Sequence, residues 1–412
     1  MSVHATTAKL ASISLFSSFI LLACGSSSSG PSTTDTGGSD TGGTATMGGS
    51  NGQGGSSIAG SVGNGGSNPT GGMTGGGSGG ASAGTGPGGS GGAGGSGGGV
   101  TAGTGGTDPN GDPPAPHPLS VTAAPALYKY TKIDAKGNEA GVDTRAAKMA
   151  GKLVIDLGVT QGHFNANLAK RGFHSMSALQ VNACSGINGA LFAGGKGPAY
   201  DGDCRLNTLD GKPHGAESTV SVADSIMTQI ATNLKALKTA HADQGWGYFL
   251  NDDDSVRWSD VAWTGYSHGA TSAVVFAFTL RSYRAVAMSG PRDNVCGTGV
   301  SKTPDFDPAK PPYDTACPAS KIANWEGLTP VTPIERFFSF TGLQDSEYGD
   351  IMFAAEHLHF VGVPTNITTG KAPYGGTHRF YAATGHSDFS SGYDDAVNIA
   401  FGVLPENLNP TF

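Results

Sequence analysis

The chain has 412 residues, a formal net charge of −8, 14% charged residues and 68 glycines. Mild acidity without clusters of Lys and Arg argues against nucleic acid as a partner. The glycines are concentrated towards the N-terminus, so the composition predicts a chain made of unlike parts rather than one continuous globular unit.

Residues 1–23 have the pattern of a bacterial signal peptide. Lys9 precedes a largely apolar run that is too short to span a bilayer comfortably. The run ends in Leu21-Leu22-Ala23-Cys24, which resembles the lipobox of bacterial lipoproteins. That resemblance implies cleavage before Cys24, acylation of its thiol and new amino group, and a membrane anchor there. Because Gly25 follows instead of Asp, the outer membrane or cell surface of a Gram-negative-type bacterium is favoured; a plain secretory signal is the alternative.

Residues 24–113 form a predicted linker. From residue 25 onwards this stretch holds 37 of the 68 glycines, four Asp, no Lys or Arg and no aromatic residue. Such a sequence cannot bury enough apolar surface to offset its chain entropy, so we predict a disordered tether. A flexible Gly/Ser chain of this length would separate its ends by about 50 Å.

Residues 114–412 are long enough to form one sizeable domain. Without the signal lysine and the four linker aspartates, the chain carries 23 basic and 28 acidic residues. The four remaining cysteines allow three pairings, of which the local one, Cys184–Cys204 with Cys296–Cys317, is favoured. None has metal-ligand spacing, so structural disulfides in an oxidising compartment are expected, without cofactor or metal.

The predicted strands and helices alternate along this domain, which indicates an α/β fold with a mostly parallel sheet covered on both faces. An amphipathic helix over residues 221–237, with Ser221 capping its first turn, is the clearest single element. Strands are predicted at residues 127–133, 152–157, 176–181, 284–288, 336–341 and 377–382, and another starts at residue 261. Further helices are predicted at residues 164–171, after residue 268, at 350–358 and at 394–402.

The sequence Gly265-Tyr266-Ser267-His268-Gly269 has the form G-x-S-x-G between a predicted strand and a predicted helix. In that context the pattern indicates a nucleophile elbow, a sharp turn that exposes a reactive serine. Gly265 and Gly269 would avoid a collision across the turn. The same pattern around Ser50, Ser78, Ser90 and Ser96 lies in the linker and is compositional; an ordinary turn serine is the alternative for Ser267.

With this motif the chain resembles the α/β-hydrolases over most of residues 127–402. In that family the order is Ser…Asp/Glu…His, each after a strand. The resemblance implies Asp345 as the acid, with Glu347 and Asp350 as nearby alternatives. It implies His386 as the base, in preference to His357, His359 and His378.

The same resemblance implies an oxyanion hole made of backbone N–H groups. One would come from His268, whose side chain is expected to shape the site rather than act as a second base. The other would come from Val159 or Thr160, in a loop that lacks the usual His-Gly or Pro-Gly, so the donor stays open.

The predicted activity is hydrolysis of carboxylic esters, small or polymeric, by a monomer through an acyl-enzyme. A peptidase or amidase with the same triad and a non-catalytic binding protein on a hydrolase scaffold are the alternatives. An insertion at about residues 291–335 is expected to act like a cap. It is either a surface excursion with its own small core or a wall of the substrate pocket that contains Phe306, Tyr313 and Trp325.

Overall fold

The computed structural model describes residues 112, 115–126, 131–132, 134–157, 163–179, 199–215, 218–297, 313–387, 389 and 391–411. The predicted signal peptide, Cys24 and nearly all of the predicted linker lie outside these residues. Among the residues described, no helix is both long and apolar enough to cross a membrane.

A nine-stranded sheet runs through the described part of the chain, in the order β1-β2-β4-β3-β5-β6-β7-β9-β8. β1 and β2 pair antiparallel at one edge, β2 pairs antiparallel with β4, and the strands from β4 to β8 in this order are parallel. The strands are β1 (Thr131–Lys132), β2 (Glu139–Val142), β3 (Leu153–Asp156), β4 (His174–Ser177), β5 (Val261–Tyr266), β6 (Arg284–Met288), β7 (Phe337–Gly342), β8 (Thr365–Asn366) and β9 (Arg379–Ala382).

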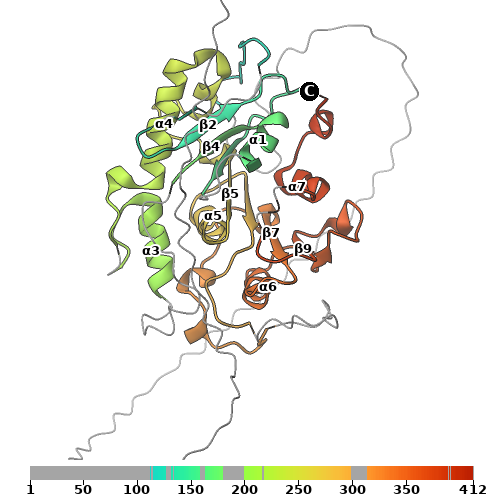
Figure 1. Ribbon diagram of the computed structural model, residues 1–412. Helices are drawn as coiled ribbons and strands as arrows, with labels where there is room; N and C mark the ends of the chain where they lie inside the picture. The colour runs from blue at the N-terminus through green and yellow to red at the C-terminus, as the bar shows by residue number, and fades with distance from the viewer. Residues whose placement is uncertain are drawn as a thin grey trace, which may run out of the picture. The chain divides into compact units, whose positions relative to one another are not determined.

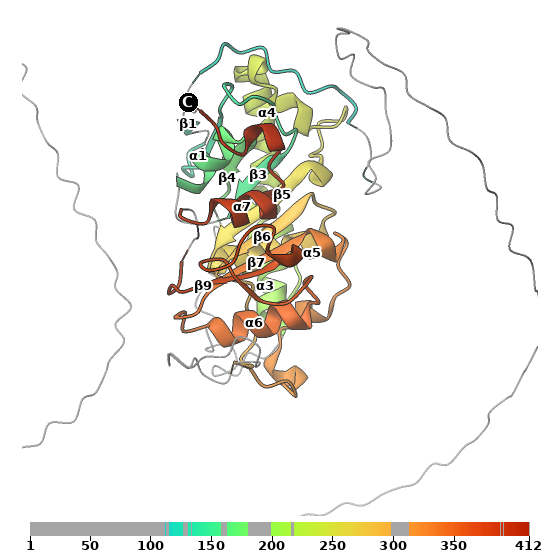
Figure 2. The same ribbon diagram turned by 90° about the vertical axis from the view of Figure 1, so that its right-hand side faces the viewer.

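Helices cover both faces of the sheet (Figures 1 and 2). Side chains of β3 show the two layers: Leu153 and Ile155 belong to one core and Val154 to the other. Burial on both faces is typical of parallel strands. The predicted α/β architecture, a mostly parallel sheet covered by helices on both faces, is therefore confirmed. The first core includes α4 (Ile226–Ala240) and α5 (His268–Thr279), with α3 (Ala199–Asp210) packed on both and α6 (Tyr348–His357) after β7; the second includes α1 (His163–Lys170) and α7 (Asp394–Phe401).

The predicted amphipathic helix begins later than its apolar spacing suggested. α4 starts at Ile226, and its cap is Ser225, whose side chain accepts a hydrogen bond from Thr228 N at 3.3 Å. Ser221 precedes a short 3-10 turn and makes no capping hydrogen bond, so the predicted cap at this residue is wrong. Val222 is 56% exposed because it lies outside the helix and its apolar face.

A disulfide closes the insertion after β6, as predicted. Cys296 and Cys317 form a disulfide with a Cα–Cα distance of 5.6 Å. Cys204 is also disulfide-bonded, while its predicted partner Cys184 lies outside the described residues. Trp325 is 1% exposed and packs edge-on against Phe278 in the core shared with α5. Its prediction as a pocket wall is therefore wrong, because the indole fills the main core instead.

A buried carboxyl within this insertion makes stability depend on pH. Burial raises the pKa of Glu326 from 4.5 to about 8, and the charge of Asp293 adds to the effect. Above pH 4.5 the unfolded chain loses this proton, whereas the folded protein keeps it until about pH 8. The contribution to the free energy of unfolding is therefore complete below the unfolded pKa and falls as pH rises towards 8.

Glu326→Gln should reduce the decrease in the free energy of unfolding with rising pH, because glutamine has no proton to lose. Urea denaturation of both proteins between about pH 5 and pH 8 measures the difference. Equal slopes of unfolding free energy against pH in the two proteins would contradict the assignment.

Candidate active site

Ser267 occupies a strained turn between β5 and α5. Its backbone has φ 56° and ψ −114°, a conformation that costs a non-glycine residue about 1–3 kcal/mol. A Cβ on Gly265 would lie 2.5 Å from the backbone carbon of Gly269, so the predicted role of Gly265 is confirmed. The N–H of Ser267 donates to the carbonyl of Met288 at 2.8 Å, which fixes the turn against β6.

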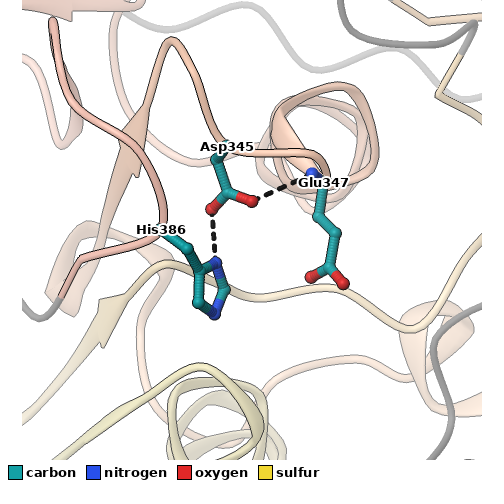
Figure 3. Close-up of side chains that lie close together, drawn as sticks. All are labelled: Asp345, Glu347 and His386. Carbon is teal, nitrogen blue, oxygen red and sulfur yellow. Dashed lines mark hydrogen bonds and ion pairs between the residues drawn. The ribbon is translucent and has the colours of Figure 1, made fainter. Parts of the chain in front are cut away.

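Asp345 and His386 are brought together from two loops on the same edge of the sheet. Asp345 follows β7 and His386 follows β9. His386 Nδ1 and Asp345 Oδ2 are 2.6 Å apart (Figure 3). The Asp345 side chain is fully buried, and its other oxygen accepts a hydrogen bond from Glu347 N at 2.9 Å. A carboxylate at Nδ1 holds the proton on that nitrogen and leaves Nε2 as a proton acceptor.

The rival carboxylates predicted from sequence have other partners. The side chain of Glu347 forms an ion pair with Arg292. The Oδ1 atom of Asp350 accepts a hydrogen bond from Gly297 N at 2.6 Å, which holds the start of the insertion. Of the three acidic residues, Asp345 is therefore the one that contacts a histidine.

The rival histidines are placed elsewhere. His357, the last residue of α6, and His359, just after it, are exposed, and the ring of His357 stacks on Phe353. The ring of His378 stacks on Phe338 at a centroid distance of 3.9 Å.

The loop that carries His386 lies unusually close to the end of β7. A Cβ on Gly342 would lie 2.1 Å from the carbonyl oxygen of Gly385. On the other side, Ser289 Oγ donates to the carbonyl of Ser387 at 2.8 Å and accepts from its N–H at 3.0 Å. Gly342 and Ser289 thus fix the positions of Gly385 and Ser387, the residues on either side of His386. The roles of Gly342 and Ser289 were not predicted from the sequence. The signal that could have found them is their position at carboxyl ends of adjacent predicted strands.

Ser267 lies beside this pair without a direct hydrogen bond to it. The ring of Tyr266, the preceding residue, contacts the His386 ring at a centroid distance of 4.9 Å. Within the described residues no hydrogen bond joins Ser267 Oγ to His386; Arg292 Nη2 donates to Ser267 Oγ at 3.4 Å instead. Catalytic hydrogen bonds are often long without substrate and tighten in the complex.

His268 is held as a neutral ring by a buried arginine. Arg205 donates to both carboxylate oxygens of Asp293, at 2.7 and 2.8 Å, and its Nη1 lies 3.1 Å from His268 Nδ1. An arginine can only donate, so Nδ1 accepts and the proton lies on Nε2. Burial, together with the charges of Arg205 and Arg292, lowers the pKa of His268 from 6.5 to about 2. This ring cannot act as a base near neutral pH.

His268 is also the first residue of α5, where backbone N–H groups point out of the helix end. This is the geometry that the predicted oxyanion donor needs. The other predicted donors, Val159 and Thr160, lie outside the described residues.

The cluster of Asp345, Glu347 and His386 fits a proton relay better than a metal centre. One nitrogen or oxygen atom from each of Asp345, Glu347 and His386 lies within 4.8 Å of the others. However, Asp345 already binds the His386 ring, and the Arg292 guanidinium already neutralises Glu347. A divalent cation would have to displace both contacts.

Comparison with solved structures finds similarity to esterases. An acetyl xylan esterase from Aspergillus awamori is 12% identical, with 68% of this chain and 100% of that chain covered and a TM-score of 0.31. An arylesterase is 10% identical, with 70% of this chain and 88% of that chain covered and a TM-score of 0.33. The apo form of esterase 2 from Thermogutta terrifontis is 12% identical, with 69% of this chain and 92% of that chain covered and a TM-score of 0.28. No family model and no curated protein matches the sequence.

Gly342→Ala should disturb the histidine loop, since the new methyl group would overlap the carbonyl oxygens of Thr384 and Gly385. We expect a destabilisation of about 1–3 kcal/mol and a shifted or broadened proton resonance of the His386 Nδ1–H. Denaturant unfolding and proton NMR measure these effects.

Gly327→Ala is the matched control, because a Cβ there would meet no atom within 4 Å. If both variants unfold at the same denaturant concentration and keep the same resonance, the close approach at Gly342 does not position His386.

Proposed function

We propose that the protein is a serine hydrolase that cleaves carboxylic esters through an acyl-enzyme. The observation that carries the proposal is the strained backbone of Ser267 at the sheet edge where Asp345 binds His386. Strain at a polar residue, next to a histidine oriented by a buried carboxylate, is the arrangement that nucleophilic catalysis requires.

In the proposed mechanism, Ser267 Oγ attacks the ester carbonyl and His386 Nε2 takes the serine proton. A bond from Oγ to the acyl carbon forms, and the bond to the alcohol oxygen breaks as His386 returns the proton to it. Water then attacks the acyl-enzyme by the same relay. Asp345 stabilises the imidazolium in both steps, and the backbone N–H of His268 faces the oxyanion.

Ser267→Ala, His386→Ala and Asp345→Asn should each lower kcat on p-nitrophenyl butyrate by about 10⁴-fold or more, because each removes a member of one relay. The double variant Ser267→Ala/His386→Ala should be no slower than either single variant. Initial-rate kinetics with circular dichroism as a folding check measure this.

Asp350→Asn is the matched control, since this carboxylate holds Gly297 and does not contact His386. A larger loss of kcat in the Asp350 variant than in the Asp345 variant would contradict the assigned roles. Turnover of peptide anilides but not of esters would favour the peptidase alternative.

We also propose that the protein is exported and tethered to the outer membrane through acylated Cys24, with the Gly-rich segment as the spacer. The support is the lipobox-like Leu21-Leu22-Ala23-Cys24 at the end of an apolar run and the glycine-rich composition that follows it. A domain on such a tether could reach a polymeric or surface-bound ester.

In cells fed labelled palmitate, the wild-type protein should carry the label in the membrane fraction. Cys24→Ser should lose the label and leave that fraction, because the thiol that takes the lipid is gone. A labelled Cys24→Ser protein, or an unlabelled wild-type protein, would contradict the anchor.

A further inference from the structure

A buried arginine, Arg205, and a partly buried one, Arg292, lie near Ser267, and they differ in how their donors are used. Arg205 is 2% exposed and donates to Asp293, His268 and Ser272. Arg292 is 13% exposed, and within the described part of the chain its side chain makes the ion pair with Glu347 and the 3.4 Å hydrogen bond to Ser267 Oγ. A guanidinium carries five N–H donors, so Arg292 retains donors for another acceptor.

The backbone of Arg292 is fixed beside the nucleophile. Its N–H donates to Thr271 Oγ1 at 3.1 Å, and Thr271 Oγ1 donates back to its carbonyl at 3.2 Å. Thr271 lies in the first turn of α5, so this segment is clamped to the same helix end as Ser267. Burial lowers the pKa of Arg292, and the nearby charges of Asp293 and Asp345 oppose that shift.

Glu347 places a carboxylate against this guanidinium. The two side chains are 13% and 17% exposed, so the pair borders solvent instead of being sealed in the core. The Glu347 side chain extends alongside His386, away from the Asp345 carboxylate (Figure 3). The forked guanidinium can bind a carboxylate through two parallel hydrogen bonds. The contact with Glu347 does not use all of its N–H donors.

The position of Arg292 indicates which half of an ester it faces. β6, β7 and β9 lie on one side of β5, and β3 lies on the other. Arg292 follows β6 and contacts Glu347 of the loop after β7, so it lies on the side of His386. The histidine delivers its proton to the departing alcohol, which places that alcohol near Arg292.

We propose that Arg292 is a specificity-determining residue that binds a carboxylate on the alcohol half of the ester. Glu347 occupies the guanidinium in the free protein and is displaced or shared when the substrate carboxylate arrives. The inference rests on the proposed ester hydrolysis at Ser267 and names the substrate class: esters of alcohols or phenols that carry a carboxylate.

The test compares two acetate esters, 3-acetoxybenzoate and its uncharged methyl ester, on the full chain. The measured quantity is the ratio of kcat/KM for the anionic ester to kcat/KM for the methyl ester. Arg292→Met should lower this ratio by about 10- to 100-fold, mainly through a higher KM for the anionic ester. Arg292→Lys should give an intermediate ratio, because it keeps the charge but loses the fork. Glu347→Gln should raise the ratio, because it removes the competing charge.

Arg336→Met is the matched control, because Arg336 is another largely enclosed arginine whose partner is a carboxylate, that of Asp112, at 2.8 Å. It lies just before β7, at the opposite end of the strand from Asp345, so the selectivity ratio should stay that of the wild type. An unchanged ratio in Arg292→Met would overturn the proposal. So would an equal loss on both esters, which would assign Arg292 to the reaction itself. If Arg292→Met unfolds, the double variant Arg292→Met/Glu347→Gln removes both charges together and gives the same comparison.

A binding measurement separates this inference from the proposed function. If the wild type hydrolyses neither ester, the proposed function fails, and calorimetry with 3-hydroxybenzoate still tests Arg292. Binding that is at least about 10-fold weaker in Arg292→Met supports the carboxylate site. Equal binding, or none in the wild type, overturns it.

Discussion

The register of the parallel strands is the constraint on which the site depends. Gly265 of β5 lies opposite Ala287 of β6, Ala287 opposite Ser339 of β7, and Ser339 opposite Arg379 of β9. The strands therefore end at nearly the same level, and the loops that follow them leave the sheet at one edge. Side chains more than a hundred residues apart in sequence meet there without any long excursion of the chain.

The close contacts at this edge carry a cost that the rest of the fold must offset. Asp345 is a fully buried carboxylate, which is stable only because the His386 ring and the N–H of Glu347 satisfy its oxygens. Ser267 adopts a positive φ, and the His386 loop lies against Gly342 with no room for a side chain. The two apolar layers on either side of the sheet supply the rigidity that keeps these contacts in place.

Much of this arrangement was predictable from local patterns. The G-x-S-x-G turn, the strand over residues 284–288 and the disulfide Cys296–Cys317 carry their own signals in glycine spacing, apolar runs and loop length. The start of α4 was not predictable from apolar spacing alone, because Val222 fits the helical period yet lies in a separate 3-10 turn. Ser225 ends that turn and caps the helix.

The supporting residues around the nucleophile carried no comparable signal. Arg205, Ser289 and Arg292 are ordinary polar residues in sequence, and their importance arises from tertiary contacts with His268, Ser387 and Ser267. α3, which carries Arg205, has a weak apolar pattern, and no strand-to-helix motif marks it. A single sequence does not reveal which segments distant along the chain come into contact.

The most direct test of the account is a crystal structure of the protein after reaction with an alkyl fluorophosphonate. We expect phosphorus bonded to Ser267 Oγ, a phosphonyl oxygen at the backbone N–H of His268, and His386 Nε2 within hydrogen-bonding reach of the serine oxygen. Modification at another residue, or an unmodified Ser267 with the imidazole of His386 directed away from it, would contradict the central claim.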